Sequence, residues 1–163
     1  HHIDRTVAQL ALLAAASVDQ AQAVRSEKNM SLELANQIAA AGVAACQAGG
    51  YNVAVTVVDR AGGVRAVQRA DNAGPHTLAA SQQKAFTSAS AKNNTLAMME
   101  TAQKNPGAAN LVNIPGFLLL GGGVPVKVGN DVIGAVGIGG APAGNLDEQC
   151  ALAALDKVKD QLK

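Results

Sequence analysis

The side chains best suited to chemistry lie in the stretch QRADNAGPHT, residues 68–77. This stretch supplies Arg69, Asp71, His76 and Thr77. Lys84 follows Thr77 by two helical turns, and helical spacing places both on one side of a predicted helix. A helix N-terminus flanked by Arg69 and Lys84 attracts a carboxylate, because its dipole and both cations favour negative charge. Since a neutral imidazole binds metal ions well, we predict an anion pocket with His76 as a metal ligand.

A purely structural interpretation fits the same stretch. Thr77 is suited to cap the helix, and Asp71 and Asn72 are typical of a turn. In that interpretation Lys84 is solvated and His76 is an exposed loop residue. The residues of the stretch leave both interpretations open.

Several familiar catalytic sites are excluded by pattern. The chain contains no G-x-S-x-G elbow for a nucleophilic serine. It has too few histidines and cysteines to supply a zinc site easily. The glycine-rich text GIGGAPAG lacks the G-x-G-x-x-G spacing of a dinucleotide-binding turn. We therefore assign no catalytic residue.

The two cysteines, Cys46 and Cys150, each fall inside a predicted helix. An oxidising compartment would permit a disulfide if these helices were neighbours. Free cysteine also behaves as a small buried apolar residue. We favour that second interpretation for both cysteines.

Composition restricts the class of protein and of partner. The 163 residues are 48% hydrophobic and 15% charged, which predicts one folded domain with a normal core. The formal charge is +1, the basic residues are scattered, and aromatic residues make up only 2%. Nucleic acid is therefore a poor partner, because both phosphate binding and base stacking lack their usual residues.

The first 23 residues have the pattern of a tag and a secretion signal. His1 and His2 resemble the remainder of a purification tag, and the apolar run that follows Arg5 ends in Ala21-Gln22-Ala23. This small-x-small pattern is typical of a secretion signal, and the run is too short for a membrane span. We expect residues 1–23 to be tag and signal, 24–163 to be one domain, and the mature chain to begin at Val24 in the periplasm or outside the cell. The alternatives are a short helix packed on the domain and a cytoplasmic protein.

Periodicity and turn residues predict nine elements in the order α-β-β-α-α-β-β-β-α. The expected helices begin at Ser31, Thr77, Thr95 and Asn145, and the expected strands cover 51–59, 64–70, 116–122 and a hairpin about Gly129-Asn130-Asp131. Consecutive hairpins imply a mostly antiparallel sheet, which helices must cover. The fold class is therefore α+β, an antiparallel sheet flanked by helices.

Two long stretches resemble the GlcG/HbpS-like haem-binding family. They are VTVVDRAGGVRAVQRADNAGPHTLAASQQKAFTSAS and NIPGFLLLGGGVPVKVGNDVIGAVGIGGAPAGNLDEQCALAAL. The resemblance implies a profilin-like α+β domain that forms homo-oligomers, from dimers to octamers. Some members are secreted and bind haem or sense redox state, and others are cytoplasmic. The family is also labelled haem-degrading.

The resemblance implies that Gly74, Pro75, His76 and Thr77 border the ligand pocket. Lys84 and Phe86 follow on the helix that these residues begin. Haem iron on His76 is our inference from this chain's own residues, since neutral imidazole binds iron. With so few aromatic residues, a haem here needs aliphatic walls and dimer partners.

Three functions follow from these observations. The first is a secreted or periplasmic homo-oligomer that binds haem or iron, in haem sensing or in protection against oxidative stress. The second is an enzyme acting on haem or on a small oxygenated acid, with Arg69 or Lys84 anchoring the carboxylate and Asp71 or His76 moving protons. The third is a sensory or assembly module without chemistry.

Overall fold

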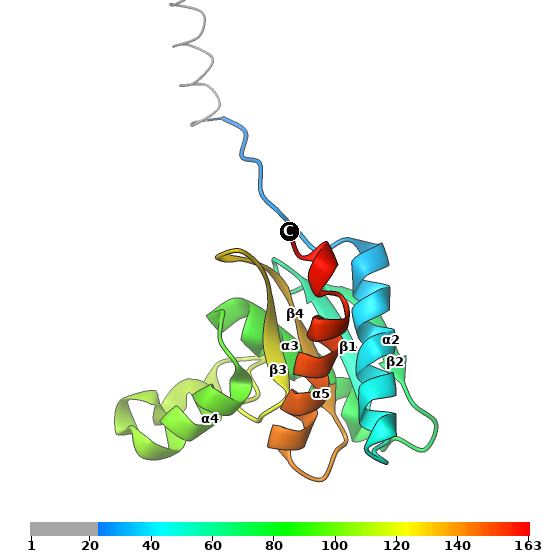
Figure 1. Ribbon diagram of the computed structural model, residues 1–163. Coiled ribbons are helices and arrows are strands. Elements are labelled where there is room, and N and C mark those ends of the chain that lie inside the picture. The colour runs from blue at the N-terminus through cyan, green and yellow to red at the C-terminus, as the bar shows by residue number, and fades with distance from the viewer. Residues whose placement is uncertain (1–22) are drawn as a thin grey trace, which may run out of the picture.

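The computed structural model describes residues 23–163 (Figure 1). The expected signal, apart from Ala23, lies outside these residues. The helices are α2 Leu32–Ala48, α3 His76–Ala91, α4 Thr95–Lys104 and α5 Gly144–Lys157, with 3-10 helices η1 Pro106–Asn113 and η2 Lys159–Gln161. The strands are β1 Ala54–Asp59, β2 Val64–Arg69, β3 Gly123–Val128 and β4 Asp131–Gly139. The α+β class is confirmed. No helix within residues 23–163 is long and apolar enough to cross a membrane.

The strands form one antiparallel sheet in the order β2-β1-β4-β3. Thr56 of β1 lies opposite Val67 of β2 on one side and Gly137 of β4 on the other. The predicted hairpin about Gly129-Asn130-Asp131 is confirmed, because β3 ends at Val128 and β4 begins at Asp131.

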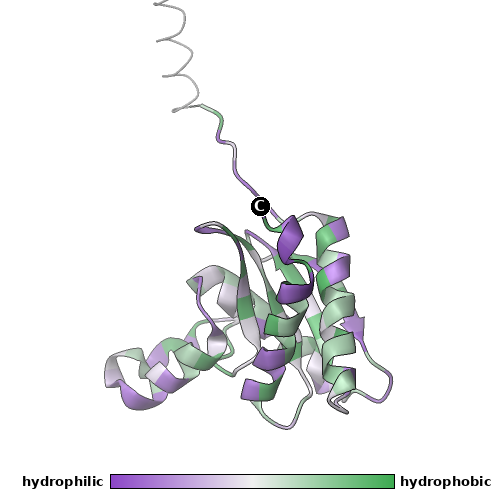
Figure 2. Cartoon of the chain, in the orientation of Figure 1, coloured by the Kyte–Doolittle hydropathy of each residue, from purple (hydrophilic) through white to green (hydrophobic). Residues whose placement is uncertain are grey.

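The larger core lies between the sheet and the helices α2 and α5, which cover one face side by side (Figure 1). Alternate residues of the two central strands point into it, among them Val55, Val57, Val136 and Ile138. Figure 2 shows these strands in green, with purple residues on the outer surfaces of the helices. Ser31 caps α2 as predicted, since its Oγ accepts a hydrogen bond from the Leu34 N–H.

The opposite face of the sheet is covered by α3, which approaches closely because the residues between them are small. A Cβ atom at Gly137 would lie only 2.1 Å from the Ser81 carbonyl oxygen. The Oγ of Ser81 also lies 2.7 Å from the Thr56 Oγ1 in a buried hydrogen bond. Glycine in β4 therefore sets the distance at which α3, and every residue on it, lies over the sheet.

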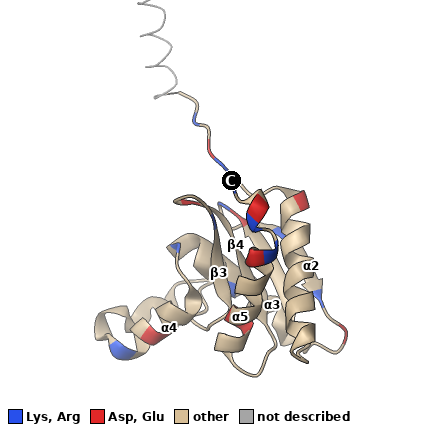
Figure 3. Cartoon of the chain, viewed as in Figure 1, with Lys and Arg blue, Asp and Glu red and all other residues tan. Residues whose placement is uncertain are grey.

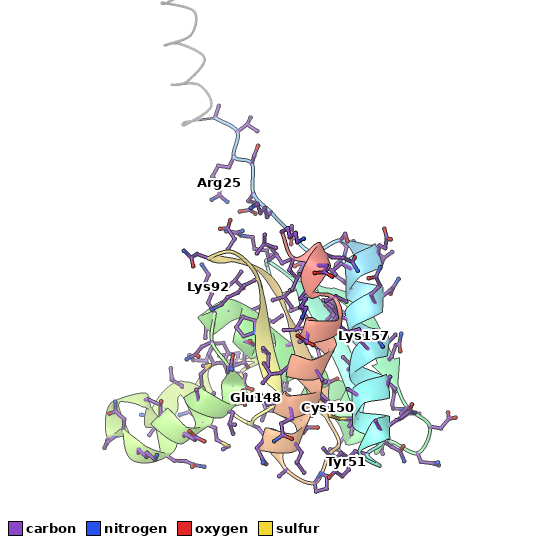
Figure 4. The ribbon with its side chains drawn as sticks, viewed as in Figure 1. Arg25, Tyr51, Lys92, Glu148, Cys150 and Lys157 are labelled. Atoms are coloured by element: carbon purple, nitrogen blue, oxygen red, sulfur yellow. A yellow bond between two sulfur atoms is a disulfide. The ribbon has the colours of Figure 1, made fainter. Side chains whose placement is uncertain are left out.

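The prediction that Cys46 and Cys150 are separate apolar residues was wrong. They form a disulfide between α2 and α5, with Cα atoms 5.4 Å apart and a separation of 104 positions in sequence. Figure 4 labels Cys150 on α5, where this helix runs beside α2. Local patterns around each cysteine carry no information about the other, so only helix packing reveals the pair.

The predicted strand over 116–122 was also wrong. These residues end an arm, residues 95–122, which contains α4 and η1 and projects beside the sheet (Figure 1). Buried hydroxyl groups bind its backbone in place of a partner strand: Thr87 Oγ1 accepts from the Leu118 N–H, and Thr95 Oγ1 donates to the Leu120 carbonyl oxygen. Apolar content therefore predicted a strand where side-chain hydrogen bonds hold an irregular segment. The sheet consequently has four strands, one fewer than predicted.

Three helix starts differ from the prediction. The N-caps of α3, α4 and α5 are Pro75, Asn94 and Ala143, and none of these three makes a side-chain capping bond. Thr77 and Thr95 lie inside their helices, where their hydroxyls donate to carbonyl oxygens instead. A hydroxyl beside a helix start is available to other partners, and tertiary contacts select them here.

Candidate functional site

His76 is the first residue of α3 and its side chain is exposed. The imidazole lies back over Gly74, where an added Cβ atom would come within 2.8 Å of its Nδ1 and Cε1. Gly74 therefore leaves the space in which this ring rests. The imidazole is thus open to solvent, and its role as a metal ligand stays a prediction.

An apolar groove of about 330 Å³ runs along the outer face of α3. Its lining residues are Gly62, Ala79, Gln82, Gln83, Phe86 and Gly116. Added Cβ atoms at Gly62 and Gly116 would lie 3.0 Å and 3.2 Å from the Phe86 ring, and both glycines have positive φ. The β1–β2 turn and the arm thus reach Phe86 from two sides because they carry glycine there.

Helical spacing connects His76 to this groove. Ala79, Gln83 and Phe86 follow His76 by three, seven and ten residues, which places all four on one stripe of α3, where only Phe86 is half-buried. Phe86 packs edge-on against Phe117 of the arm, with ring centroids 6.2 Å apart. Phe86 was predicted to border the ligand. Ala79 and Gln83 were missed, although the same spacing could have found them, and so was Gln82, which lies off this stripe.

Arg69 and Asp71 lie near the start of α3, the first at the end of β2 and the second in the turn that follows. Both are exposed, and neither forms an ion pair with another residue of the described chain 23–163. Along the ribbon in Figure 3, basic and acidic residues are interspersed rather than gathered in a stripe. Ligand binding by Arg69 and Asp71 stays a prediction.

Lys84 does not contribute to this surface, and the predicted pocket between Arg69 and Lys84 was wrong. The side chain of Lys84 is 2% exposed. The Lys84 Nζ donates to the Ile138 carbonyl oxygen at 2.9 Å and to Asp147 Oδ2 at 3.1 Å. Thr77 is likewise fully buried, with its hydroxyl on the Gly74 carbonyl oxygen. Both side chains point toward the sheet and hold α3 in place rather than facing a ligand.

Asp147, in the first turn of α5, is the partner that sequence reasoning missed. Its Oδ1 accepts from the Ala141 N–H at 3.0 Å while Oδ2 meets Lys84. Burial raises the pKa of Asp147 and lowers the pKa of Lys84, and the attraction between the two charges opposes both shifts. The pair joins α3, the end of β4 and the start of α5 across 63 residues of sequence.

No cluster of three or more His, Cys, Asp or Glu side chains that could hold a metal ion occurs among residues 23–163. A free iron ion needs several protein ligands, whereas the iron of haem already has four nitrogen ligands and needs one or two more. One exposed imidazole beside an apolar groove therefore fits haem better than it fits a bare ion.

Comparison with known proteins places the chain in a family. Residues 30–156 match the model of the family described as Haem degrading protein HbpS-like. The chain belongs to this family. The predicted resemblance is therefore confirmed, over nearly all of the domain.

Individual relatives agree with the HbpS-like assignment. The Protein GlcG of Escherichia coli K12 is 37% identical over 109 residues, which cover 67% of this chain and 80% of that protein. A crystal structure of a double mutant of HbpS from Streptomyces reticuli is 36% identical with a TM-score of 0.78, covering 84% and 92% of the two chains. The protein ORFY of Klebsiella pneumoniae reaches the same TM-score at 30% identity, covering 83% and 94%. A PduOC protein, solved as a haem complex, shares the fold at 23% identity with a TM-score of 0.70, covering 78% and 94%.

Proposed function

We propose that this protein binds haem, with His76 as a ligand to the iron and the groove of α3 beneath the porphyrin. The observation that carries the proposal is the exposed imidazole of His76 on the same helical stripe as the apolar groove at Phe86. Membership of a family described as haem-degrading supports it, as does the haem complex of a protein with the same fold.

The size of the groove determines how haem would lie. At about 330 Å³ it is near the small end of ligand pockets, which span about 300–1,000 Å³. A porphyrin would therefore lie over the groove with one face uncovered. A second copy of the chain in a homo-oligomer is the cover that we propose, since exposed apolar area is commonly buried by association.

Replacing His76 is the direct test. We expect His76→Ala to weaken haemin binding at least about tenfold, because the iron loses its protein ligand. Titration followed at the Soret band measures this. Free imidazole added to a His76→Gly variant should restore the wild-type band, and Gly74→Ala, which displaces the ring, should weaken binding less than His76→Ala. An unchanged affinity and spectrum in His76→Ala would remove His76 from the site, and no saturable band in the wild type would refute haem binding.

The disulfide supports a location in the periplasm or outside the cell, because such bonds persist in oxidising compartments. Haem sensing or protection against oxidative stress is the role that we propose there. Among the described residues, 23–29 are exposed and Met30, at 4% exposed, is the first buried one. Cleavage after Ala23 would therefore remove no buried residue of the described part of the chain.

The proposed secretion signal determines where the mature chain begins. We expect protein isolated from the periplasm or medium of its native host to begin at Val24. Intact-mass spectrometry measures the start directly. A chain recovered from those compartments with residues 1–23 attached would contradict the secretion signal.

A further inference from the structure

Strand β2 carries an apolar surface that α3 leaves uncovered. Val67 lies opposite Thr56, and Thr56 contacts Ser81 of α3, so Val67 faces the same side of the sheet as this helix. Val67 nevertheless remains 44% exposed, and Leu78, one helical turn before Ser81, is 40% exposed. Two large aliphatic side chains therefore face solvent from neighbouring elements.

The charged residue that β2 places on this face is basic. Arg69 is two residues from Val67 on the same strand and so shares its face. Its guanidinium forms no ion pair or hydrogen bond with another residue of the described part of the chain. Asp71 is the only acidic residue between Arg60 and Met99. A ligand for this surface should thus combine an apolar face with negative charge.

We propose that Val67 and Leu78 support the edge of a tetrapyrrole ring while Arg69 binds one of its carboxylates. This rests on the proposed function and adds a carboxylate site, independent of iron, to the iron ligand His76. The surface adjoins the groove, because Gln82, which lines the groove, follows Leu78 by one turn of α3. A flat apolar ring with acidic substituents on one edge matches both the aliphatic side chains and the free guanidinium.

The experiment compares haemin with haemin dimethyl ester, whose carboxylates are blocked and whose iron is unchanged. Wild-type protein should bind the ester about tenfold more weakly than haemin, because one charge-assisted hydrogen bond to a carboxylate is lost. Arg69→Gln should weaken haemin binding by a similar factor and change ester binding by less than about twofold. Lys127→Gln is the control, since it removes an exposed charge from the opposite edge strand β3. Protoporphyrin without iron should show the same dependence on Arg69 and none on His76.

The outcomes separate this inference from the proposed function. Equal affinities of the wild type for haemin and its ester, or equal losses in Arg69→Gln and Lys127→Gln, would overturn the carboxylate site while haem binding stands. No binding of haemin to the wild type would refute the proposed function itself. A change of molecular mass in Arg69→Gln, measured by light scattering, together with unchanged haemin affinity would assign the surface to contact between copies and overturn the inference.

Discussion

Replacing Lys84 by Met is expected to lower the free energy of unfolding by about 3–5 kcal/mol, the usual cost of removing one partner of a buried ion pair. Met keeps most of the aliphatic length of lysine, so little packing is lost. The Asp147 carboxylate, however, remains buried without its cation. Chemical denaturation of the wild type and the variant at pH 7 measures the difference.

A double variant distinguishes charge from packing. In Lys84→Met with Asp147→Asn, no charge is buried, and the amide oxygen can still accept from the Ala141 N–H that Asp147 binds. We expect this variant to recover more than half of the loss, since uncharged replacement of a buried pair is often nearly neutral. A double variant no more stable than Lys84→Met would show that the loss came from packing.

The pH dependence gives a second signature. Without Lys84, only the hydrogen bond from the Ala141 N–H still opposes burial, so the pKa of Asp147 rises further above the ordinary value. Between the ordinary value and the raised one, the folded chain binds more protons than the unfolded chain, so stability falls as pH rises. The Lys84→Met variant should therefore become more stable as pH falls from 7 toward 5, and Lys84→Met/Asp147→Asn should not show this gain. A variant that loses stability over that range would contradict the assignment.

Breaking the disulfide is expected to have an effect of similar size. It closes a loop between residues 104 apart, for which chain entropy gives about 4–5 kcal/mol, and native disulfides commonly contribute about 2–5 kcal/mol. Reduced protein should unfold roughly 10 °C lower than oxidised protein. Thermal unfolding with and without dithiothreitol measures this.

A Cys46→Ala/Cys150→Ala variant serves as the control, because reductant has no bond to break there. It should unfold near the reduced wild type and show no response to dithiothreitol. Equal thermal unfolding midpoints for the oxidised and reduced wild type would mean that apolar contacts alone hold α2 and α5 together.

Local sequence patterns predicted much of the architecture because they depend on neighbouring residues. The β-branched run predicted as a strand over 51–59, the glycine turn at 129 and the cap at Ser31 each depend on a few neighbouring residues. The turn and the cap were found as expected, and the strand is shorter, Ala54–Asp59. His76 is exposed, as the purely structural interpretation of its stretch had it, although α3 begins one residue earlier than predicted. The family resemblance agreed with the fold class that the order of the elements predicted.

The failures share a physical cause, which is that the deciding partner lies far away in sequence. Lys84 has the spacing of a surface residue, yet Asp147 and the Ile138 carbonyl oxygen draw its ammonium into the interior. The arm has the composition of a strand, yet the hydroxyls of Thr87 and Thr95 take its backbone groups. The residues adjacent in sequence give no indication of such contacts.

Residue types and spacing thus established the class of the fold, most of its helices and strands, and the imidazole and arginine available to a ligand. Only the packed molecule decided that Cys46 meets Cys150, that Lys84 is structural, and that Phe86 borders a groove between the β1–β2 turn and the arm. The reason is that burial is a property of the assembled layers. A side chain becomes buried or exposed according to what covers it, and its cover comes from elements tens of residues away.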